Sequence, residues 1–365
     1  MLFNLSNSSI IFRSGLLLVL FMGLVLAGCG DEPSDRVSET DKESVREIHQ
    51  SMNQGISLGN AFIFPKTGNW VVEPEREYFR LMKESGFSTV RIPVQWSAYS
   101  QQTSPYSISE PFMERLAEAV DRILSKEMNV ILVFSEYSLL STHPQREKER
   151  FLALWDQVSE RFKGYPNELQ FEIYHRPTGE LSSEKWNSLQ KEAITVIREA
   201  NPQRILIAGP VYKNNRAIFD ELILPQNDAH ILVGINYYQP FMFTHQGANW
   251  LQAPADEWLG TEWRGTEAEI EEINHFFQEV STWAGMNNRR VVLTEFGSFF
   301  LAPNTSRSAW AHTVRTKAEE YEISWVYFDF GSGFGLYNWH IDRWNRPVLE
   351  ALLPESPVLL ENVSD

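Results

Sequence analysis

From Met52 onward, short apolar runs alternate with longer stretches whose apolar residues recur every three or four positions. The short runs are typical of strands buried on both faces of a parallel sheet, and the longer stretches are typical of amphipathic helices that cover such a sheet. Eight strand and helix pairs can be counted, with strands expected at 55–59, 89–94, 130–134, 169–175, 204–208, 231–237, 290–295 and 324–330. The pattern predicts an α/β fold with a single (β/α)8 TIM barrel. A doubly wound open sheet is the alternative, but it usually has fewer strands and needs a phosphate loop that we do not find.

Residues 1–28 have the pattern of a targeting segment. Arg13 precedes an uncharged run that is too short and too asymmetrically flanked for a membrane span, and the run ends Leu26-Ala27-Gly28-Cys29. This ending resembles a bacterial lipoprotein signal, in which cleavage precedes the Cys and its thiol is acylated. Cys29 is the only cysteine, so a disulfide within the chain is excluded. The alternative is a buried thiol that follows an ordinary signal peptide.

The segment after the cysteine is polar, charged and free of aromatic residues, which predicts a disordered tether over 29–48 and a barrel domain over 49–365. Gly30 rather than Asp after the cysteine resembles sorting to an outer membrane. We therefore expect a protein of the bacterial cell envelope, anchored by lipid at Cys29 in the outer membrane, facing the periplasm or the cell surface.

The formal net charge of −16 argues against a nucleic-acid partner, because phosphate binding needs clustered Lys and Arg. Aromatic side chains are abundant, with 12 Trp, 12 Tyr and 23 Phe, and suit a site that stacks on the apolar faces of sugar rings, although most aromatics belong to the core. No His spacing on a predicted element indicates a metal site, and we expect neither a metal nor another cofactor.

Two glycine-containing segments resemble catalytic motifs but lack the required context. GISLG at 55–59 matches the G-x-S-x-G elbow of serine hydrolases, which must turn directly into a helix, and NAFIFP follows instead. GSGFG at 331–335 resembles a nucleotide loop but continues into LYNW rather than a helix. Both segments are therefore interpreted as turns.

A carboxylate at the end of the predicted seventh strand is the first candidate for chemistry. Glu295 follows the apolar run 291–293, and active sites of TIM barrels lie at the carboxyl ends of the strands. The alternative is a solvated strand-end Glu or a structural ion pair. Carboxylates at strand ends suggest sugar chemistry, since retaining glycoside hydrolysis uses one to attack and another to protonate the leaving oxygen.

Segments spread from about Met52 to Pro354 resemble family 5 of the glycoside hydrolases, the cellulase-type (β/α)8 barrels. They are GISLGNAF, GFSTVRIPVQWS, FEIYHRPTGEL, INYYQPFMFTHQGANW, VVLTEFGSF and FDFGSGFGLYN, in the family's order. The resemblance implies that Glu295 is the nucleophile, that Arg91 supports it and that Tyr238 positions it. It also implies that Glu172 lies deeper in the barrel and holds Arg91.

The sequence departs from the family where the proton donor belongs. The family's fourth strand reads Phe-Glu-x-x-Asn-Glu-Pro, in which the Asn orients the substrate and the second Glu donates the proton. Those two positions are His175 and Arg176, while Phe171, Glu172 and Pro177 keep the register. Further departures are Ser135 and Glu136 for a His pair after the third strand, Asn236 for the His of the sixth and Phe328 for the Trp of the eighth.

A guanidinium stays charged at neutral pH and cannot act as a general acid. Loss of a positioned donor typically lowers a rate by about a hundred- to ten-thousand-fold. We also predict a direct ion pair between Arg176 and Glu295, which would lower the pKa of Glu295 and weaken it as a nucleophile. Glu136 or His175 is a possible relocated donor, but we favour an exposed loop carboxylate for Glu136 and a sugar hydroxyl contact for His175.

The predicted function is recognition of a β-glycan, a polysaccharide or oligosaccharide, by a monomeric family 5-like protein with impaired hydrolysis. The alternative is an active retaining O-glycosyl hydrolase of the endo-β-glucanase or mannanase type, with Glu295 as nucleophile and a relocated donor. Four tryptophans in loops after strands two, six and eight are expected to line the cleft or to pack beneath those loops, namely Trp96, Trp250, Trp263 and Trp339. The predicted substrate-binding residues are His175, Asn236, Glu136, Trp96, Trp250 and Phe328.

Overall fold

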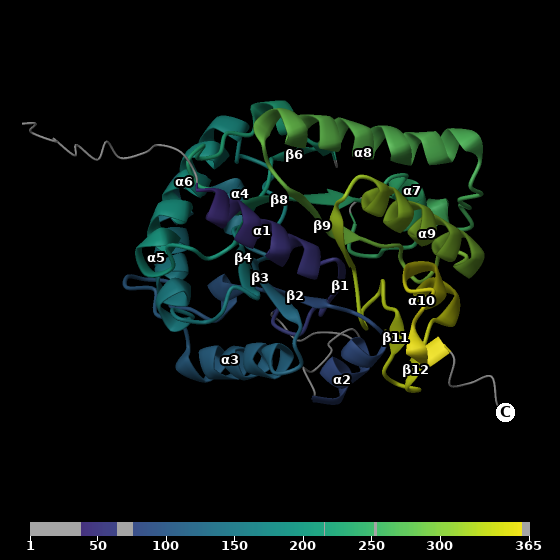
Figure 1. Cartoon of the computed structure of the whole chain (residues 1–365), viewed down its shortest axis with the longest axis horizontal. Coiled ribbons are helices and arrows are strands. Elements are labelled where there is room, and N and C mark those ends of the chain that lie inside the picture. The colour runs from purple at the N-terminus through teal and green to yellow at the C-terminus, as the bar shows by residue number, and fades with distance from the viewer. Residues whose placement is uncertain (1–37, 64–75, 215, 252–253, 360–365) are drawn as a thin grey trace, which may run out of the picture. The chain divides into compact units, whose positions relative to one another are not determined.

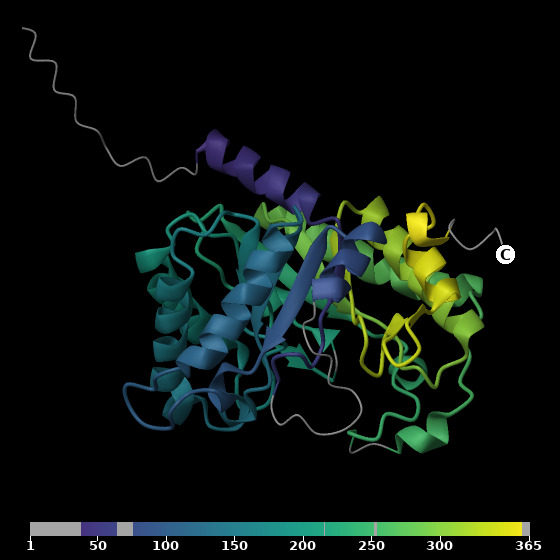
Figure 2. The same ribbon diagram turned by 90° about the horizontal axis from the view of Figure 1, so that it is seen from below.

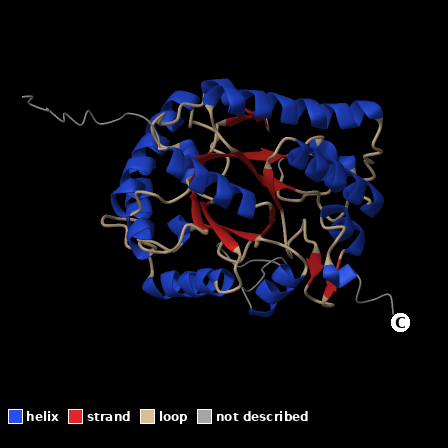
Figure 3. Ribbon diagram, in the orientation of Figure 1, coloured by secondary structure: helices blue, strands red, loops and turns tan. Residues whose placement is uncertain are grey.

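The computed structural model describes residues 38–63, 76–214, 216–251 and 254–359. Within them, parallel strands close into a barrel in the order β1, β10, β9, β8, β5, β4, β3, β2 (Figures 1 and 3). The barrel strands are β1 (Gln54–Ser57), β2 (Thr89–Val94), β3 (Asn129–Phe134), β4 (Leu169–Glu172), β5 (Leu206–Ala208), β8 (Ile231–Tyr237), β9 (Val291–Phe296) and β10 (Ser324–Tyr327). The predicted fold is confirmed, and each predicted strand overlaps one of these.

Helices surround the barrel (Figure 3). They are α2 (Arg76–Glu84), α3 (Glu110–Leu124), α4 (Ser138–Thr142), α5 (Pro144–Arg161), α6 (Ser183–Ala200), α7 (Phe241–Thr244), α8 (Glu267–Asn287), α9 (Asn304–Glu320) and α10 (Arg346–Leu352), with 3-10 turns η1 (Trp96–Ala98), η2 (Phe219–Glu221), η3 (Ala255–Trp258) and η4 (Pro357–Leu359). Helix α8 illustrates the local rules. Thr266 and Glu269 form a capping box at its start, and Ile273, Phe277 and Val280 are buried on one face. Of the described helices, none combines the length and apolar character needed to cross a bilayer.

An additional helix, α1 (Glu39–Ser51), precedes the first strand. The prediction of a disordered tether is therefore wrong for residues 39–48. Val45 in the helix and Met52 just after it are buried in one apolar cluster at this end of the barrel. The other members of the cluster come from the strands or from just before them: Ile131, Ile205, Ile207, Leu232, Val292 and Val326. His49 lies with its Nε2 2.7 Å from the carbonyl oxygen of Val291. The apolar face of α1 is narrow and the rest of the helix is charged, so the composition of this segment predicts disorder rather than a packed helix. The signal segment, Cys29 and the rest of the predicted tether up to residue 37 lie outside the described residues.

Helix α1 lies across the amino-terminal end of the strands, and the strands point away from it (Figure 2). The opposite end carries the long loops and two small hairpins. One hairpin, β6 (Tyr212–Lys213) with β7 (Arg216–Ala217), follows β5, and the other, β11 (Tyr337–Asn338) with β12 (Arg343–Trp344), follows β10. This arrangement leaves the carboxyl ends of the strands as the face on which a site can form.

Candidate active site

A cleft of about 410 Å³ opens at the carboxyl ends of the strands. It is lined by Asn60, Ile63, Pro93, Ser135, Glu136, His175, Arg176, Tyr238, His245, Trp250, Glu295, Phe328, Ser332, Gly333 and Phe334. Residues that the sequence places hundreds of positions apart therefore share one hollow, because parallel strands end on the same side of a barrel.

Arg91 on β2 joins two carboxylates beneath the cleft. Its Nε and Nη2 donate to Oε2 and Oε1 of Glu172 at 2.6 and 2.9 Å, and its Nη1 donates to Oε1 of Glu295 at 2.6 Å. All three side chains are buried. The implied supporting position of Arg91, and that of Glu172 below it, agree with this geometry. A buried cation held by two carboxylates in this way has little freedom to move.

The second oxygen of Glu295 has three close neighbours. Tyr238 donates its hydroxyl to Oε2 at 3.0 Å, Asn236 donates Nδ2 at 3.2 Å, and Nε2 of His175 lies 3.0 Å away. The same Nε2 lies 3.1 Å from Asn236 Nδ2, so a His175 that donates to Glu295 cannot also accept from Asn236. Three predicted site residues thus converge on the carboxylate of the fourth.

Burial alone would raise the pKa of Glu295, but the charges of His175 and Arg91 outweigh it and hold this pKa well below its usual range. Arg176 contributes in the same direction through its charge. Among the described residues, the ion-pair partners of Glu295 are Arg91 and His175. The prediction of a direct ion pair between Glu295 and Arg176 is therefore wrong, because Arg91 and His175 already occupy the carboxylate.

Arg176 lies over an aromatic ring instead. Its Cζ is 5.2 Å from the centroid of the Tyr212 ring, and its backbone has the left-handed conformation with φ of 47°. The hydroxyl of Tyr212 accepts the backbone N–H of Asn236 at 2.7 Å, which links this stack to the Glu295 cluster. The Arg176 side chain also lines the cleft. A permanent positive charge therefore stands beside Glu295 without touching it.

Glu136 is exposed and lines the same cleft. The backbone carbonyl of Glu136 accepts the side-chain amide of Gln95 at 2.9 Å, which ties the loop to the end of β2. Glu136 is therefore a second carboxylate in the lining. The exposed position of Glu136 agrees with the favoured interpretation as a loop carboxylate. Glu136 also lies in the cleft, where a relocated proton donor would have to act.

The tryptophans differ in what they can contact. Trp96 is fully buried and packs edge-on against Phe112, so its prediction as a substrate-binding residue is wrong: the short turn η1 directs its ring into the core. Trp263 is also buried. Trp250 is 53% exposed and lines the cleft, as does Phe328. Trp339 lies outside the cleft, in a neighbouring hollow.

Three residues near the site were not singled out from the sequence. Tyr212 carries the Arg176 stack. His245 is buried with its ring 4.0 Å from that of Phe241, and burial, together with the charge of Arg176, lowers its pKa to about 3, so it is neutral. Burial raises the pKa of Asp329 to about 7, although the backbone N–H of Ser332 donates to its carboxylate. His245 and Asp329 fall within the segments that carry the family resemblance, while Tyr212 gave no signal.

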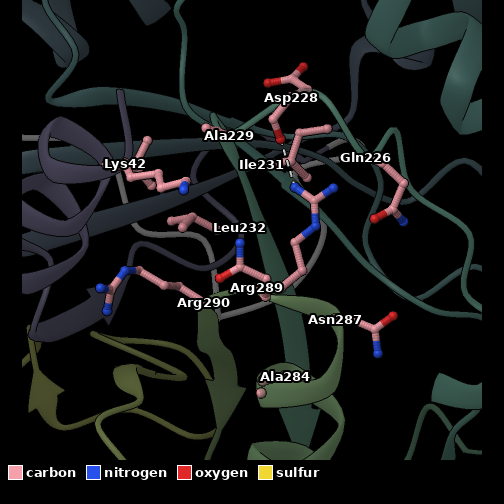
Figure 4. A pocket seen from close by; sticks show the side chains of 13 residues that line it. Lys42, Gln226, Asp228, Ala229, Ile231, Leu232, Ala284, Asn287, Arg289 and Arg290 are labelled. Carbon is pink, nitrogen blue, oxygen red and sulfur yellow. Dashed lines mark hydrogen bonds between the residues drawn. The ribbon is translucent and has the colours of Figure 1, made fainter. Parts of the chain in front are cut away.

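Another hollow, of about 340 Å³, lies at the opposite end of the barrel, beside α1 and the starts of β8 and β9 (Figure 4). There Arg289 points toward Asp228 and donates Nη1 to its backbone carbonyl at 2.7 Å. This end of a barrel serves stability rather than catalysis, and the candidate residues all lie at the other end. The described part of the chain contains no group of three or more His, Cys, Asp or Glu side chains that could hold a metal ion.

A closed barrel with buried, hydrogen-bonded carboxylates at the carboxyl ends of its strands defines a TIM-barrel protein whose candidate site lies where barrel enzymes hold theirs. The chain matches the family model described as Cellulase (glycosyl hydrolase family 5) over residues 48–333. It belongs to this family, which confirms the resemblance predicted from the sequence.

Relatives and solved structures support the same assignment. Endoglucanase H of Acetivibrio thermocellus is 30% identical over 312 residues, which is 84% of this chain and 33% of that protein. The structure of Thermotoga maritima Cel5A in complex with mannotriose is 37% identical, with a TM-score of 0.81, and the match covers 84% of this chain and 99% of that one. The clostridial cellulose synthase subunit Z of Clostridioides difficile is 36% identical, with a TM-score of 0.78 over 83% and 99% of the two chains. This chain spans about a third of Endoglucanase H and 40% of the cellulase/esterase CelE from the same organism.

Proposed function

We propose that this protein binds a β-glycan in the cleft and that its capacity for ordinary retaining hydrolysis is impaired. The observation that carries the proposal is the presence of Arg176 in the cleft, at the position that in the family provides the proton donor. A guanidinium cannot release a proton to a leaving oxygen at neutral pH. Catalysis that depends on this proton would be reduced about a hundred- to ten-thousand-fold.

The state of Glu295 supports the same proposal. An attacking carboxylate needs a basic oxygen, and Nε2 of His175 lies 3.0 Å from Oε2, in addition to the supports Arg91 and Tyr238 that the family resemblance implies. The depressed pKa of Glu295, held down by the charges of His175 and Arg91 against the effect of burial, makes this carboxylate a weaker nucleophile. Glu295 still occupies the nucleophile position, and Arg91 and Tyr238 remain its supports in the proposal.

Glycan recognition is supported by the composition of the lining. Trp250 and Phe328 provide ring faces, and His175 and Asn60 provide hydrogen-bonding groups. This mixture of aromatic surface and a few polar groups suits a saccharide. Structures of the related Thermotoga maritima Cel5A are described as complexes with mannotriose and cellobiose, so glucan and mannan oligosaccharides are the first ligands to test.

The second candidate is an active hydrolase with a relocated donor. Glu136 lines the same cleft as Glu295, and Nε2 of His175 lies within hydrogen-bond distance of the Glu295 carboxylate. Either group could carry a proton into the cleft. The relatives named endoglucanase H and endoglucanase B favour keeping this candidate.

One experiment separates the two functions. The purified protein is incubated with an activated aryl β-glycoside, β-glucan and mannan, with the Glu295→Gln variant as control. Saccharide binding measured by calorimetry without turnover supports the proposed function. Efficient turnover of β-glucan or mannan that disappears in Glu295→Gln would contradict it, whereas slow turnover of the aryl glycoside alone would not, because its leaving group needs little protonation. In the first case, the separate variants Glu136→Gln and His175→Asn would show which group acts as donor.

We also propose that Cys29 is acylated and anchors the protein in the bacterial cell envelope. The proposal rests on the sequence Leu26-Ala27-Gly28-Cys29 after an uncharged run. Metabolic labelling with a radioactive fatty acid should mark the wild-type protein but not the Cys29→Ser variant. Equal label in the two proteins, or none in either, would rule out this anchor.

A further inference from the structure

The guanidinium of Arg176 is held at the wall of the cleft by an aromatic ring that is itself fixed. Its Cζ lies 5.2 Å from the centroid of the Tyr212 ring. The backbone N–H of Tyr212 donates to the carbonyl of Pro177 at 2.9 Å, and its hydroxyl accepts the backbone N–H of Asn236 at 2.7 Å. A ligand that binds this guanidinium therefore has to order little of the protein, which favours affinity.

The positive charge of Arg176 dominates one side of the cleft. The negative charge of Glu295 at the floor is opposed by Arg91, whose Nη1 lies 2.6 Å from Oε1. At His245, in the same lining, burial is the main cause of the lowered pKa of about 3, and the charge of Arg176 lowers this pKa by more than Glu295 raises it. Glu136 also lines the cleft but is exposed to water, which weakens its field. An anionic group of a ligand is therefore attracted to the side that carries Arg176.

The charge of the whole protein limits how many anionic groups such a ligand can carry. The formal net charge of −16 repels a polyanion, as it repels nucleic acid. Charges more than about 8 Å apart are largely screened at physiological ionic strength, so a single carboxylate beside Arg176 interacts chiefly with the nearby guanidinium. The ligand that fits is therefore mostly neutral and carries an acidic group on one sugar unit.

A sugar carboxylate matches this guanidinium in geometry and in size. Arginine presents parallel N–H donors that bind a carboxylate in two places, whereas a neutral hydroxyl makes a weaker hydrogen bond with the same donors. Oxidation of the hydroxymethyl group of a hexose to a carboxylate enlarges the sugar very little, so a cleft that holds a hexose also holds the corresponding hexuronic acid. Trp250 and Phe328, in the same lining, suit the apolar faces of either sugar.

We propose that the cleft selects a β-glycan with a hexuronic acid unit, whose carboxylate pairs with the guanidinium of Arg176. This inference deepens the proposed function and rests on it, because the glycan has to bind in the cleft before its acidic group can reach Arg176. It gives the residue that replaces the family's proton donor a role in choosing the ligand. The Glu that the family has at this position would repel the same carboxylate.

Calorimetric titration of trisaccharides tests the pairing. The ligands are cellotriose and mannotriose, versions of each in which C6 of a single unit is oxidised to a carboxylate, and the methyl esters of these acids. Each unit is oxidised in turn, so that the acid is presented at every position of the trisaccharide. The wild type should bind the best of the acids about tenfold more tightly than its methyl ester, which has a similar shape without the charge. This preference should decrease from about 50 mM to about 500 mM salt, because the pair is partly exposed.

Variants show whether the preference belongs to Arg176. Arg176→Gln should bind the acid and its ester equally, and Arg176→Lys, which keeps the charge without the planar fork, should keep part of the preference. Arg161→Gln removes an exposed arginine at the end of α5 and should behave as the wild type does. Thermal melting of each variant checks that the fold is intact.

The outcomes separate this inference from the proposed function. Equal affinities of the wild type for acid and ester, or a preference that survives unchanged in Arg176→Gln, overturn the pairing while glycan binding by the cleft stands. A loss of preference in Arg161→Gln as large as in Arg176→Gln assigns the preference to net charge and also overturns the pairing. A wild-type protein that binds none of the saccharides overturns the proposed function, and this inference with it.

Discussion

Nη1 of Arg91 lies 2.6 Å from Oε1 of Glu295, and both side chains are buried. The rest of the same guanidinium holds Glu172, so one cation on β2 joins carboxylates from β4 and β9. This contact, rather than one with Arg176, fixes the orientation of the carboxylate at the floor of the cleft. Removal of either partner would leave the other charge buried with one counter-charge fewer.

Removal of the Glu295 charge should destabilise the protein. Glu295→Gln leaves Arg91 with one carboxylate fewer in a buried place, and breaking such a pair costs about 3 kcal/mol. Because the pKa of Glu295 is lowered in the folded state by His175 and Arg91 despite burial, its contribution is present above the unfolded pKa and is lost as pH falls below it. Urea unfolding should therefore show a larger loss at pH 7 than at pH 3. The exposed Glu136→Gln is the control, and a loss independent of pH would contradict the ion-pair explanation.

Asp329 should make stability fall as pH rises. Burial raises its folded-state pKa to about 7, whereas an unfolded Asp titrates near about 3.9. Between these values the folded state holds a proton that the unfolded state releases, so unfolding becomes easier by up to about 1.4 kcal/mol per pH unit. Asp329→Asn should remove this slope in urea unfolding measured from pH 5 to pH 7.5. The exposed Asp156→Asn should keep the wild-type slope, and an equal slope in Asp329→Asn would rule out this assignment.

Restoration of a carboxylic acid at the donor position should increase hydrolysis. The double variant Arg176→Glu with His175→Asn recreates the family's Asn-Glu pair and supplies a group that can donate a proton. We expect a rate on β-glucan, whose sugar leaving group needs a proton, at least about a hundredfold above that of the wild type. Arg176→Gln with His175→Asn removes the same charges without supplying an acid and serves as control. No gain in the double variant would mean that the other replaced positions, Asn236 and Phe328 among them, also limit catalysis.

Trp250 and Trp96 should respond to substitution in opposite ways. Trp250 is 53% exposed in the cleft, so Trp250→Ala should lower glycan affinity about tenfold and leave the melting temperature nearly unchanged. Trp96 is fully buried, so Trp96→Ala should cost about 3–5 kcal/mol of unfolding free energy. Calorimetric titration and urea unfolding of both variants provide the comparison. A Trp96→Ala variant with unchanged unfolding free energy and weakened glycan binding would show that Trp96 contacts the glycan after all.

Helix α1 should contribute to the stability of the barrel. Val45 in α1 is buried with apolar residues at the barrel's amino-terminal end, so Val45→Ala should lower the unfolding free energy by roughly 1.5–3 kcal/mol. Arg46→Ala, on the exposed side of α1, should leave it almost unchanged. Equal unfolding midpoints for Val45→Ala and the wild type would show that α1 does not pack against the barrel in solution.

The sequence by itself determined the barrel and the residues at its strand ends. Continuous apolar runs identify strands buried on both faces, and because such strands run parallel, their carboxyl ends must meet at one end of the barrel. Glu295, Arg91, His175, Asn236 and Tyr238 could therefore be expected to converge, and they do. The sequence did not predict the start of α1, because only a narrow stripe of its residues is apolar.

Only the tertiary structure decided which of these side chains touch. Strand order alone allowed Arg176 to reach Glu295. In the structure, the left-handed backbone at Arg176 places its guanidinium over the ring of Tyr212. Arg91 and His175 contact the Glu295 carboxylate instead. The burial of Trp96 has the same origin, since the short turn after β2 rotates its ring inward. Side-chain direction depends on the local backbone and on neighbours from distant strands, and a one-dimensional pattern does not contain either of them.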